Sequence, residues 1–152
     1  KLDILLRSAT SEDASAVAQV LIQSRAEHLP FAPSAHSPDD LRTWVADRFI
    51  PTTDVIVAEH EGQVIGVLAT SCRQGTSWID QMYVQPGWTG VGVGKQLLDH
   101  AHQRLPRPIR LYTFQANVGA RRFYERHGYQ AIELTDGQTN EERCPDVLYE
   151  LR

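Results

Sequence analysis

Three glycines alternate with other residues in Gly90-Val91-Gly92-Val93-Gly94, directly before a segment with helical periodicity. Glycine near the start of a helix costs backbone entropy, so an ordinary helix entry would not use this pattern. The first turn of a helix offers unpaired backbone N–H groups and about half a positive charge, and glycine lets an anion approach them closely. The pattern therefore predicts either a phosphate-binding loop or a plain flexible turn.

Two well-known nucleotide-binding loops do not fit this stretch. A Walker loop needs glycine five positions before the glycine of its Gly-Lys pair and Ser or Thr directly after the lysine, but Gly94-Lys95 has Thr89 and Gln96 there. The dinucleotide fingerprint G-x-G-x-x-G needs a third glycine, where this chain has Lys95 or Leu97. Neither motif explains the glycines.

The chain shows no spacing that is typical of a metal site. His100 and His102 lie two positions apart on a predicted helix, so their side chains point away from each other. Cys72 and Cys144 form no CxxC pair, and there is no HExxH motif. We therefore expect no metal, no disulfide framework and a reducing compartment.

Length and composition limit the class of protein. All 152 residues are expected to form one domain, and 41% apolar with 22% charged residues is typical of a globular chain. A formal net charge of -4 argues against nucleic acid as a partner, since phosphate backbones are bound by clustered Lys and Arg. Without an apolar run of roughly 20 residues or the features of a signal peptide, we expect a cytoplasmic protein with no membrane partner.

The first half of the chain is expected to begin with a strand and end with one. A strand near residues 3–10 leads into a helix over 14–22, and a second helix is predicted over 39–50. Two strand-like runs then meet at Glu61-Gly62, a hairpin turn. Residues 77–84 form the strand that precedes the glycines.

In the second half, the pattern predicts a helix over 93–105 and a strand over 109–114. A short helix ending near Tyr124 and closing strands over 129–135 and 146–151 follow. This order predicts an α/β fold with a mixed, mostly antiparallel sheet flanked by helices.

Two quoted stretches carry a resemblance to a known family. "VQPGWTGVGVGKQLL" followed by "NVGARRFYERHGYQ" resembles the acyl-CoA loop and the later helix of the GNAT superfamily of N-acetyltransferases. The element order resembles that of the family over nearly the whole chain. The family's loop usually carries Arg or Gln where this chain has Thr89, which affects one phosphate contact but not the backbone contacts.

The resemblance implies a GNAT-like acyl-CoA N-acyltransferase fold and acetyl-CoA as co-substrate, with the pyrophosphate held by the glycine loop. The strand "DQMYV" should part from the next strand, leaving backbone groups near Met82 and Val84 free to pair with the pantetheine amides. Asn117 matches a polar contact to the pantetheine arm, or caps a helix, or does both. The cofactor-binding residues implied are Met82, Tyr83, Val84, Thr89, Gly90, Val91, Gly92, Val93, Gly94, Lys95, Asn117 and Tyr124.

The resemblance also implies catalytic roles. Tyr124 matches the family's general acid, which protonates the departing thiolate; the alternative is that Phe123 and Tyr124 are both core aromatics. A free N–H between Met82 and Val84 suits the oxyanion. For the general base we favour Asp80, directly or through a water, against the alternative of a surface or N–H bonded carboxylate.

Glu27 and His28, at the end of the first helix, are the rivals for the base and are predicted to contact the acceptor. Family acceptor sites involve the segments "RAEHLPFAPSAHSPDD" and "DGQTNEERCPD", whose carboxylates favour a cationic acceptor.

We therefore predict an acetyl-CoA-dependent N-acetyltransferase that acts by direct transfer on the primary amine of a small molecule. A protein or peptide N-acetyltransferase and a non-catalytic acyl-CoA-binding module are the alternatives. A homodimer is compatible with this prediction, and nothing in the sequence decides the oligomeric state.

Overall fold

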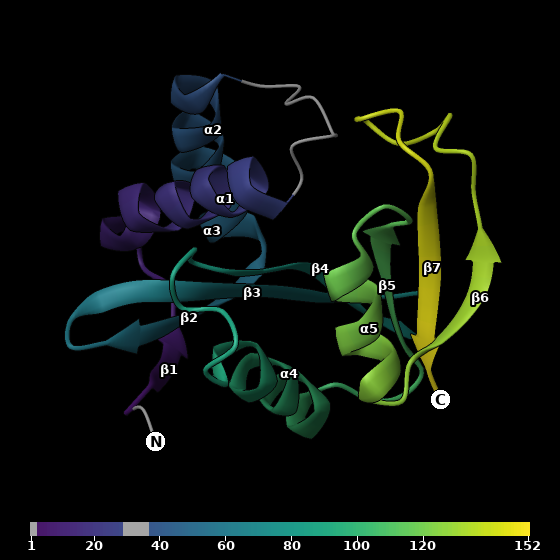
Figure 1. The fold of residues 1–152 in the computed structure, drawn as a ribbon. Coiled ribbons are helices and arrows are strands. Elements are labelled where there is room, and N and C mark those ends of the chain that lie inside the picture. Colours follow the sequence, from purple (N-terminus) through teal and green to yellow (C-terminus); the bar gives the residue numbers. More distant parts are fainter. Residues whose placement is uncertain (1–2, 29–36) are drawn as a thin grey trace.

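The computed structural model describes residues 3–28 and 37–152 and contains a seven-stranded sheet with the order β1-β2-β3-β4-β5-β7-β6 (Figure 1). Adjacent strands are antiparallel except for β4 and β5, which are parallel. This confirms the predicted mixed, mostly antiparallel sheet. The strands are β1 (Leu5–Ser8), β2 (Asp54–His60), β3 (Gln63–Arg73), β4 (Thr76–Val84), β5 (Ile109–Phe114), β6 (Gln130–Leu134) and β7 (Asp146–Leu151).

Helices cover both faces of the sheet. The first face is covered by α1 and the turns that follow it, and the second by α4 and α5. Among the described residues, no helix has both the length and the apolar character needed to cross a membrane. The helical elements are η1 (Ser11–Asp13), α1 (Ala14–His28), α2 (Pro38–Trp44), a π-helical turn η2 (Val45–Phe49), α3 (Ile50–Thr52), α4 (Val93–Arg104) and α5 (Val118–Arg126).

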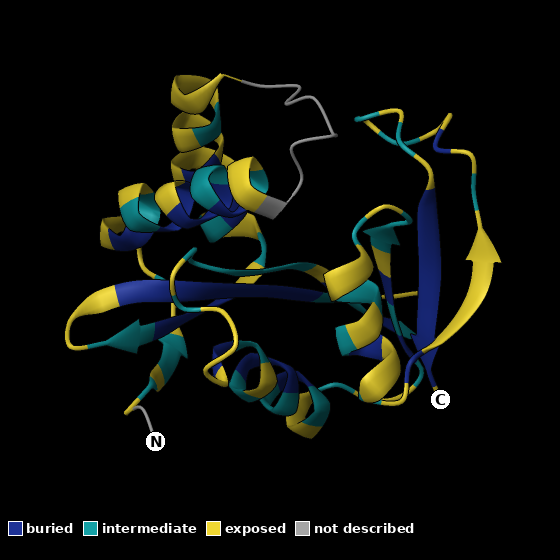
Figure 2. Cartoon of the chain, viewed as in Figure 1, coloured by how far each residue is buried: buried dark blue, intermediate teal, exposed yellow. Residues whose placement is uncertain are grey.

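The alternation of side chains along the strands divides the core into two. On β2, Val55 and Val57 pack against α1 and η2, whereas Ile56 and Ala58 pack on the side of α4 and α5. Because helices cover both of its faces, β3 is almost continuously buried, as Figure 2 shows. The predicted hairpin is confirmed, with Glu61 and Gly62 both at positive φ.

Strand β4 is paired with β5 along a small part of its length. The parallel ladder joins Ser77 to Ile109 and Trp78 to Arg110, and beyond Trp78 the two strands separate. This confirms the expectation that the "DQMYV" strand parts from its neighbour. The sheet therefore contains an opening bordered by the C-terminal half of β4.

A β-bulge marks the place where the opening begins. Ala69 and Thr70 of β3 pair with Gln81 and Ile79, so Asp80 is an extra residue on β4. Ile79 belongs to the core on the side of α4 and α5, and after the bulge Met82 packs against that core while Tyr83 packs on the side of α1. Odd-numbered residues before the bulge and even-numbered residues after it therefore face the side of α4 and α5.

A buried carboxylate holds the entry to α1. Both oxygens of Asp13 accept hydrogen bonds from the Arg7 guanidinium, at 2.8 and 2.9 Å, and one also accepts from the Thr10 N–H at 2.7 Å. Arg7 reaches Glu59 of β2 as well, at 3.0 Å. The hydrogen bonds from Arg7, with the help of Thr10, lower the pKa of Asp13 to about 2 although burial opposes this. This group ties β1 and β2 to the helix start.

Replacing Asp13 by Asn is expected to lower the free energy of unfolding at pH 7 by about 1–2 kcal/mol, because the charge-assisted bonds to Arg7 are lost. The folded pKa of Asp13 is depressed, so its contribution is complete above the unfolded value near 4 and disappears as the pH falls through about 2. Urea unfolding at pH 7 and pH 3 should show the difference reduced to about half at pH 3. A difference that does not change with pH would show that the carboxylate charge is irrelevant.

Candidate functional site

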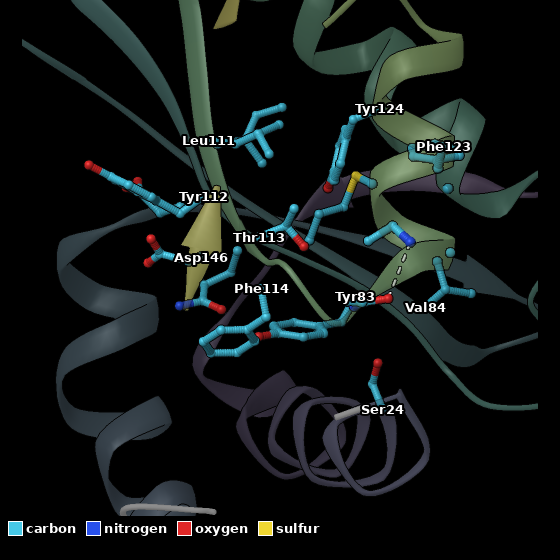
Figure 3. Close-up of a pocket in the computed structure, with 18 of the residues that line it drawn as sticks. Ser24, Tyr83, Val84, Leu111, Tyr112, Thr113, Phe114, Phe123, Tyr124 and Asp146 are labelled. Carbon is cyan, nitrogen blue, oxygen red and sulfur yellow. Dashed lines mark hydrogen bonds between the residues drawn. The ribbon is translucent and has the colours of Figure 1, made fainter. Parts of the chain in front are cut away.

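A cavity of about 1100 Å³ passes through the sheet at the opening between β4 and β5. Its lining includes Arg25 of α1 on one face of the sheet and Gly94 and Phe123 of α4 and α5 on the other, so it opens toward both faces. Figure 3 shows that side chains of β4, β5 and α5 surround it. A ligand bound from one face could therefore meet a ligand bound from the other.

Strand β4 turns toward this cavity main-chain groups that neither β3 nor β5 bonds. The Gln85 N–H donates to Ile65 O at 2.8 Å, so odd-numbered residues on this part of β4 face β3. The N–H and C=O groups of Met82 and Val84 therefore point away from β3, toward the opening that β5 leaves. An extended ligand with amide groups could pair with them as an added strand.

The glycine loop begins α4 with backbone conformations that other residues rarely adopt. Gly90 has φ 78° and Gly92, the N-cap, has φ 96°, whereas Gly94 lies within the helix and has no positive φ. The first bond of the helix runs from Gln96 N–H to Gly92 O at 3.0 Å, and the preceding N–H groups have no intrahelical acceptor. The loop thus combines a turn that needs glycine with a helix start that suits an anion.

The predicted loop residues divide into two groups. Thr89, the three glycines and Lys95 line the cavity, and Lys95 Nζ contacts Asp99 at 2.8 Å on the exposed side of α4. Val91 is exposed, and the Val93 side chain is buried in the core. For these two valines, only main-chain groups can contribute to a site in the loop.

The Tyr124 side chain belongs to the core, but its hydroxyl points into the cavity (Figure 3). Its ring meets those of Phe123 and Tyr129 edge-on, with centroids 5.3 and 5.5 Å away. Within residues 3–28 and 37–152, no group hydrogen-bonds this hydroxyl. Burial raises the pKa of Tyr124 above its ordinary value, so the phenol keeps its proton at neutral pH.

Asn117 does what its place before α5 predicts. Its Oδ1 accepts a hydrogen bond from the Ala120 N–H at 3.2 Å, which confirms the N-cap, and the residue also lines the cavity. The oxygen is used by the cap, whereas the side-chain amide N–H groups can donate to a ligand.

Asp80 lies where two cavities meet. It lines the main cavity and a second one of about 500 Å³ that reaches Trp44 and Ser71. Its Oδ1 accepts from Arg73 Nη2 at 3.3 Å, and the Arg73 guanidinium lies 4.9 Å from the centre of the Trp78 ring. The role of Asp80 as a base stays a prediction, and its position at the border of the opening is compatible with it.

Glu27 and His28, the alternative candidates for the base, lie at the end of α1. Glu27 is exposed and is absent from the cavity lining, to which the same helix contributes Ser24 and Arg25. His28 ends the helix, and its side chain is outside the described part of the chain. Residues 29–36, in the segment predicted to contact the acceptor, are likewise outside it.

Several residues that line the cavity were not predicted from the sequence. Arg25 Nη2 lies 3.2 Å from Glu142 Oε2. Burial raises the pKa of Tyr83, and Arg25 opposes this rise. Arg25 and Glu142 fall inside the two segments expected to form the acceptor site, but their pairing depends on tertiary structure.

Further side chains enclose this end of the cavity. Tyr112 and Phe114 come from β5, and Asp146 begins β7 (Figure 3). Asp146 accepts hydrogen bonds from the Thr135 hydroxyl and, at 3.1 Å, from Asn140 Nδ2. No cluster of three or more His, Cys, Asp or Glu side chains suited to a metal occurs among residues 3–28 and 37–152.

Comparisons with known proteins agree with this geometry. The family model described as acetyltransferase (GNAT) domain matches residues 51–131, more than half of the chain. Peptidyl-lysine N-acetyltransferase YiaC of Escherichia coli is 25% identical over 129 residues, which are 85% of each protein.

Two solved structures share the fold. The apo form of YjaB from Escherichia coli has a TM-score of 0.79 at 21% identity, over 98% of this chain and 97% of that one. PaiA N-acetyltransferase from Thermoplasma acidophilum, in complex with coenzyme A, has a TM-score of 0.79 at 19% identity, over 99% of both chains.

Alanine at Gly92 and at Gly94 should have opposite effects on stability. Gly92→Ala forces an L-residue to φ 96° and should cost about 1 kcal/mol or more, although its Cβ would meet no atom within 4 Å. Gly94→Ala places its Cβ 3.5 Å from the Phe123 ring, an ordinary contact, and should be neutral or stabilising by up to about 1 kcal/mol. Equal unfolding free energies for the two variants in urea would contradict this assignment.

Proposed function

The chain belongs to the GNAT acetyltransferase family, and we propose that it transfers the acetyl group of acetyl-CoA directly to the primary amine of a small molecule. The observation that carries the proposal is that free β4 main-chain groups, a glycine-rich helix start and the Tyr124 hydroxyl all border one cavity that opens on both sheet faces. This arrangement suits direct transfer, because the thioester and the amine must be held next to each other in a reactive geometry.

The residues around the opening fit acetyl-CoA. The N–H groups at the start of α4, with Thr89 and Lys95, would bind the pyrophosphate, and the main-chain groups of Met82 and Val84 would pair with the pantetheine amides. The Asn117 amide borders the same path. The structural neighbour PaiA, whose structure contains coenzyme A, supports this assignment through the shared fold.

Tyr124 is proposed as the general acid. Loss of coenzyme A as a thiolate is made easier by a proton donor next to the sulfur. The Tyr124 hydroxyl points into the cavity, and burial keeps it protonated over the whole neutral range. A main-chain N–H of β4 would stabilise the negative charge that develops on the acetyl oxygen during attack.

Asp80 is proposed to accept the proton of the attacking ammonium, directly or through a water. A primary amine has an ordinary pKa near 10, so at neutral pH it must lose a proton before it can attack. Asp80 lies at the bulge where the opening begins, on the side from which the acceptor would enter.

We place the acceptor at the end of the cavity on the side of α1. This end favours a small molecule because side chains from several elements surround it. Arg25 of α1, Phe114 of β5 and Glu142 of the β6–β7 segment all line it. The second candidate is a lysine side chain in a protein, which the relative named peptidyl-lysine N-acetyltransferase supports. A thiol-release assay with acetyl-CoA tests the proposal, with panels of small amines and of lysine peptides, and no release with any amine would contradict it.

Tyr124→Phe is expected to keep coenzyme A binding and to lower kcat by roughly ten to a thousandfold, because the proton donor is removed while the ring still packs. Tyr129→Phe is the matched control, since it also removes a buried phenol from the same aromatic group but lies outside the cavity lining. Turnover and calorimetric titration with coenzyme A provide the measurements. If both variants lose the same activity, Tyr124 has no special role.

Asp80→Asn is expected to lower turnover most near neutral pH and to recover in part as the pH rises, because the amine then loses its proton without a base. Arg73→Ala controls for the ion pair, since it removes the partner of Asp80 but leaves the carboxylate. Measuring kcat against pH for both variants separates the two roles. A profile of unchanged shape in Asp80→Asn would assign the base to another residue.

A further inference from the structure

Arg25 connects three parts of the chain at the acceptor end of the cavity. It lies near the C-terminal end of α1, its guanidinium contacts Glu142 at 3.2 Å, and its charge opposes the rise in the pKa of Tyr83 of β4 that burial causes. The Arg25 and Glu142 side chains are 22% and 18% exposed, so water screens their attraction less than it would on an open surface. Both residues line the cavity.

Hydrogen bonds within the segment between β6 and β7 fix the turn that carries Glu142. Asn140 Nδ2 donates to Cys144 O at 2.6 Å and to Asp146 at 3.1 Å, and the Cys144 N–H donates back to Asn140 Oδ1 at 3.1 Å. Glu142 therefore projects from a turn with a defined shape, and on the other side Arg25 is supported by a regular helix. Because α1 and this turn are both fixed, the ion pair between them has a defined position at the edge of the cavity.

Resting on the proposed function, we infer that the Arg25–Glu142 ion pair sets the size of the acceptor: it admits a free primary amine and excludes a lysine within a peptide chain. A free amine places only its own short chain between β4 and β5. A peptide must in addition continue in two directions from the reacting side chain, and the ion pair joins α1 to the β6–β7 segment across one of these directions. Arg25 and Glu142 are thus specificity-determining residues and take no part in the chemical step.

The test compares two acceptors with the same reacting arm. One is n-butylamine, which is the lysine side chain alone, and the other is a heptapeptide with a blocked N-terminus and one central lysine between glycines. Thiol release gives kcat/KM for each acceptor with the full chain. The parent should prefer n-butylamine, and Glu142→Ala should shift the ratio toward the peptide by about tenfold or more, through a lower KM for the peptide.

Two further variants sharpen the result. The double variant Arg25→Glu with Glu142→Arg rebuilds the pair with reversed charges and should return the ratio toward that of the parent. Arg42→Ala breaks a more exposed pair with Asp39 at 2.9 Å within α2, outside the cavity lining, and should leave the ratio unchanged. Calorimetric titration with coenzyme A should give the same affinity for all variants.

The outcomes separate the two proposals. A parent chain that acetylates n-butylamine, with a ratio that Glu142→Ala does not move while coenzyme A still binds, overturns the inference and leaves the proposed function in place. A parent chain that releases thiol with neither acceptor, nor with any amine of the wider panel, overturns the proposed function itself. A shift toward the peptide that the double variant reverses supports both.

Discussion

The parallel ladder between β4 and β5 joins two residue pairs and then ends, and this early end creates the opening around which the candidate site is built. A longer ladder would bond the main-chain groups of Met82 and Val84 to β5 and would leave no passage through the sheet. On its other edge, six residue pairs join β5 to β7. The opening can therefore exist without leaving β5 loose.

The opening presents different chemical groups on the two faces of the sheet. The side of α4 and α5 offers main-chain donors, a helix start and a buried phenol, all suited to a ligand with phosphates and amides. The side of α1 offers carboxylates, aromatic rings and an arginine that is already paired, which suits recognition of an acceptor. Under the proposed function, the reacting groups would meet in the plane of the sheet while each ligand keeps its own binding surface.

Much of the fold follows from local signals in the sequence. The alternating valines of β2, the Glu61-Gly62 turn, the stripe Val93, Leu97 and Ala101, and the Asn117 cap each act over a few residues, so the elements could be predicted. The separation of β4 from β5 was expected through the resemblance, since no local pattern encodes it. The bulge at Asp80 and the contact between Arg25 and Glu142 depend on register and on residues more than a hundred positions apart, and a single sequence carries no periodic signal for either.

The bulge adds a residue to β4 without changing the arrangement of the strand around it. The two pairs that flank the extra residue are consecutive on β3, so the ladder continues in the same register beyond it. A chain that lacked Asp80 could form the same pairs, with Met82 and Tyr83 on the faces that they occupy now. The border of the opening can therefore gain or lose a side chain while the main-chain groups that face the passage keep their places.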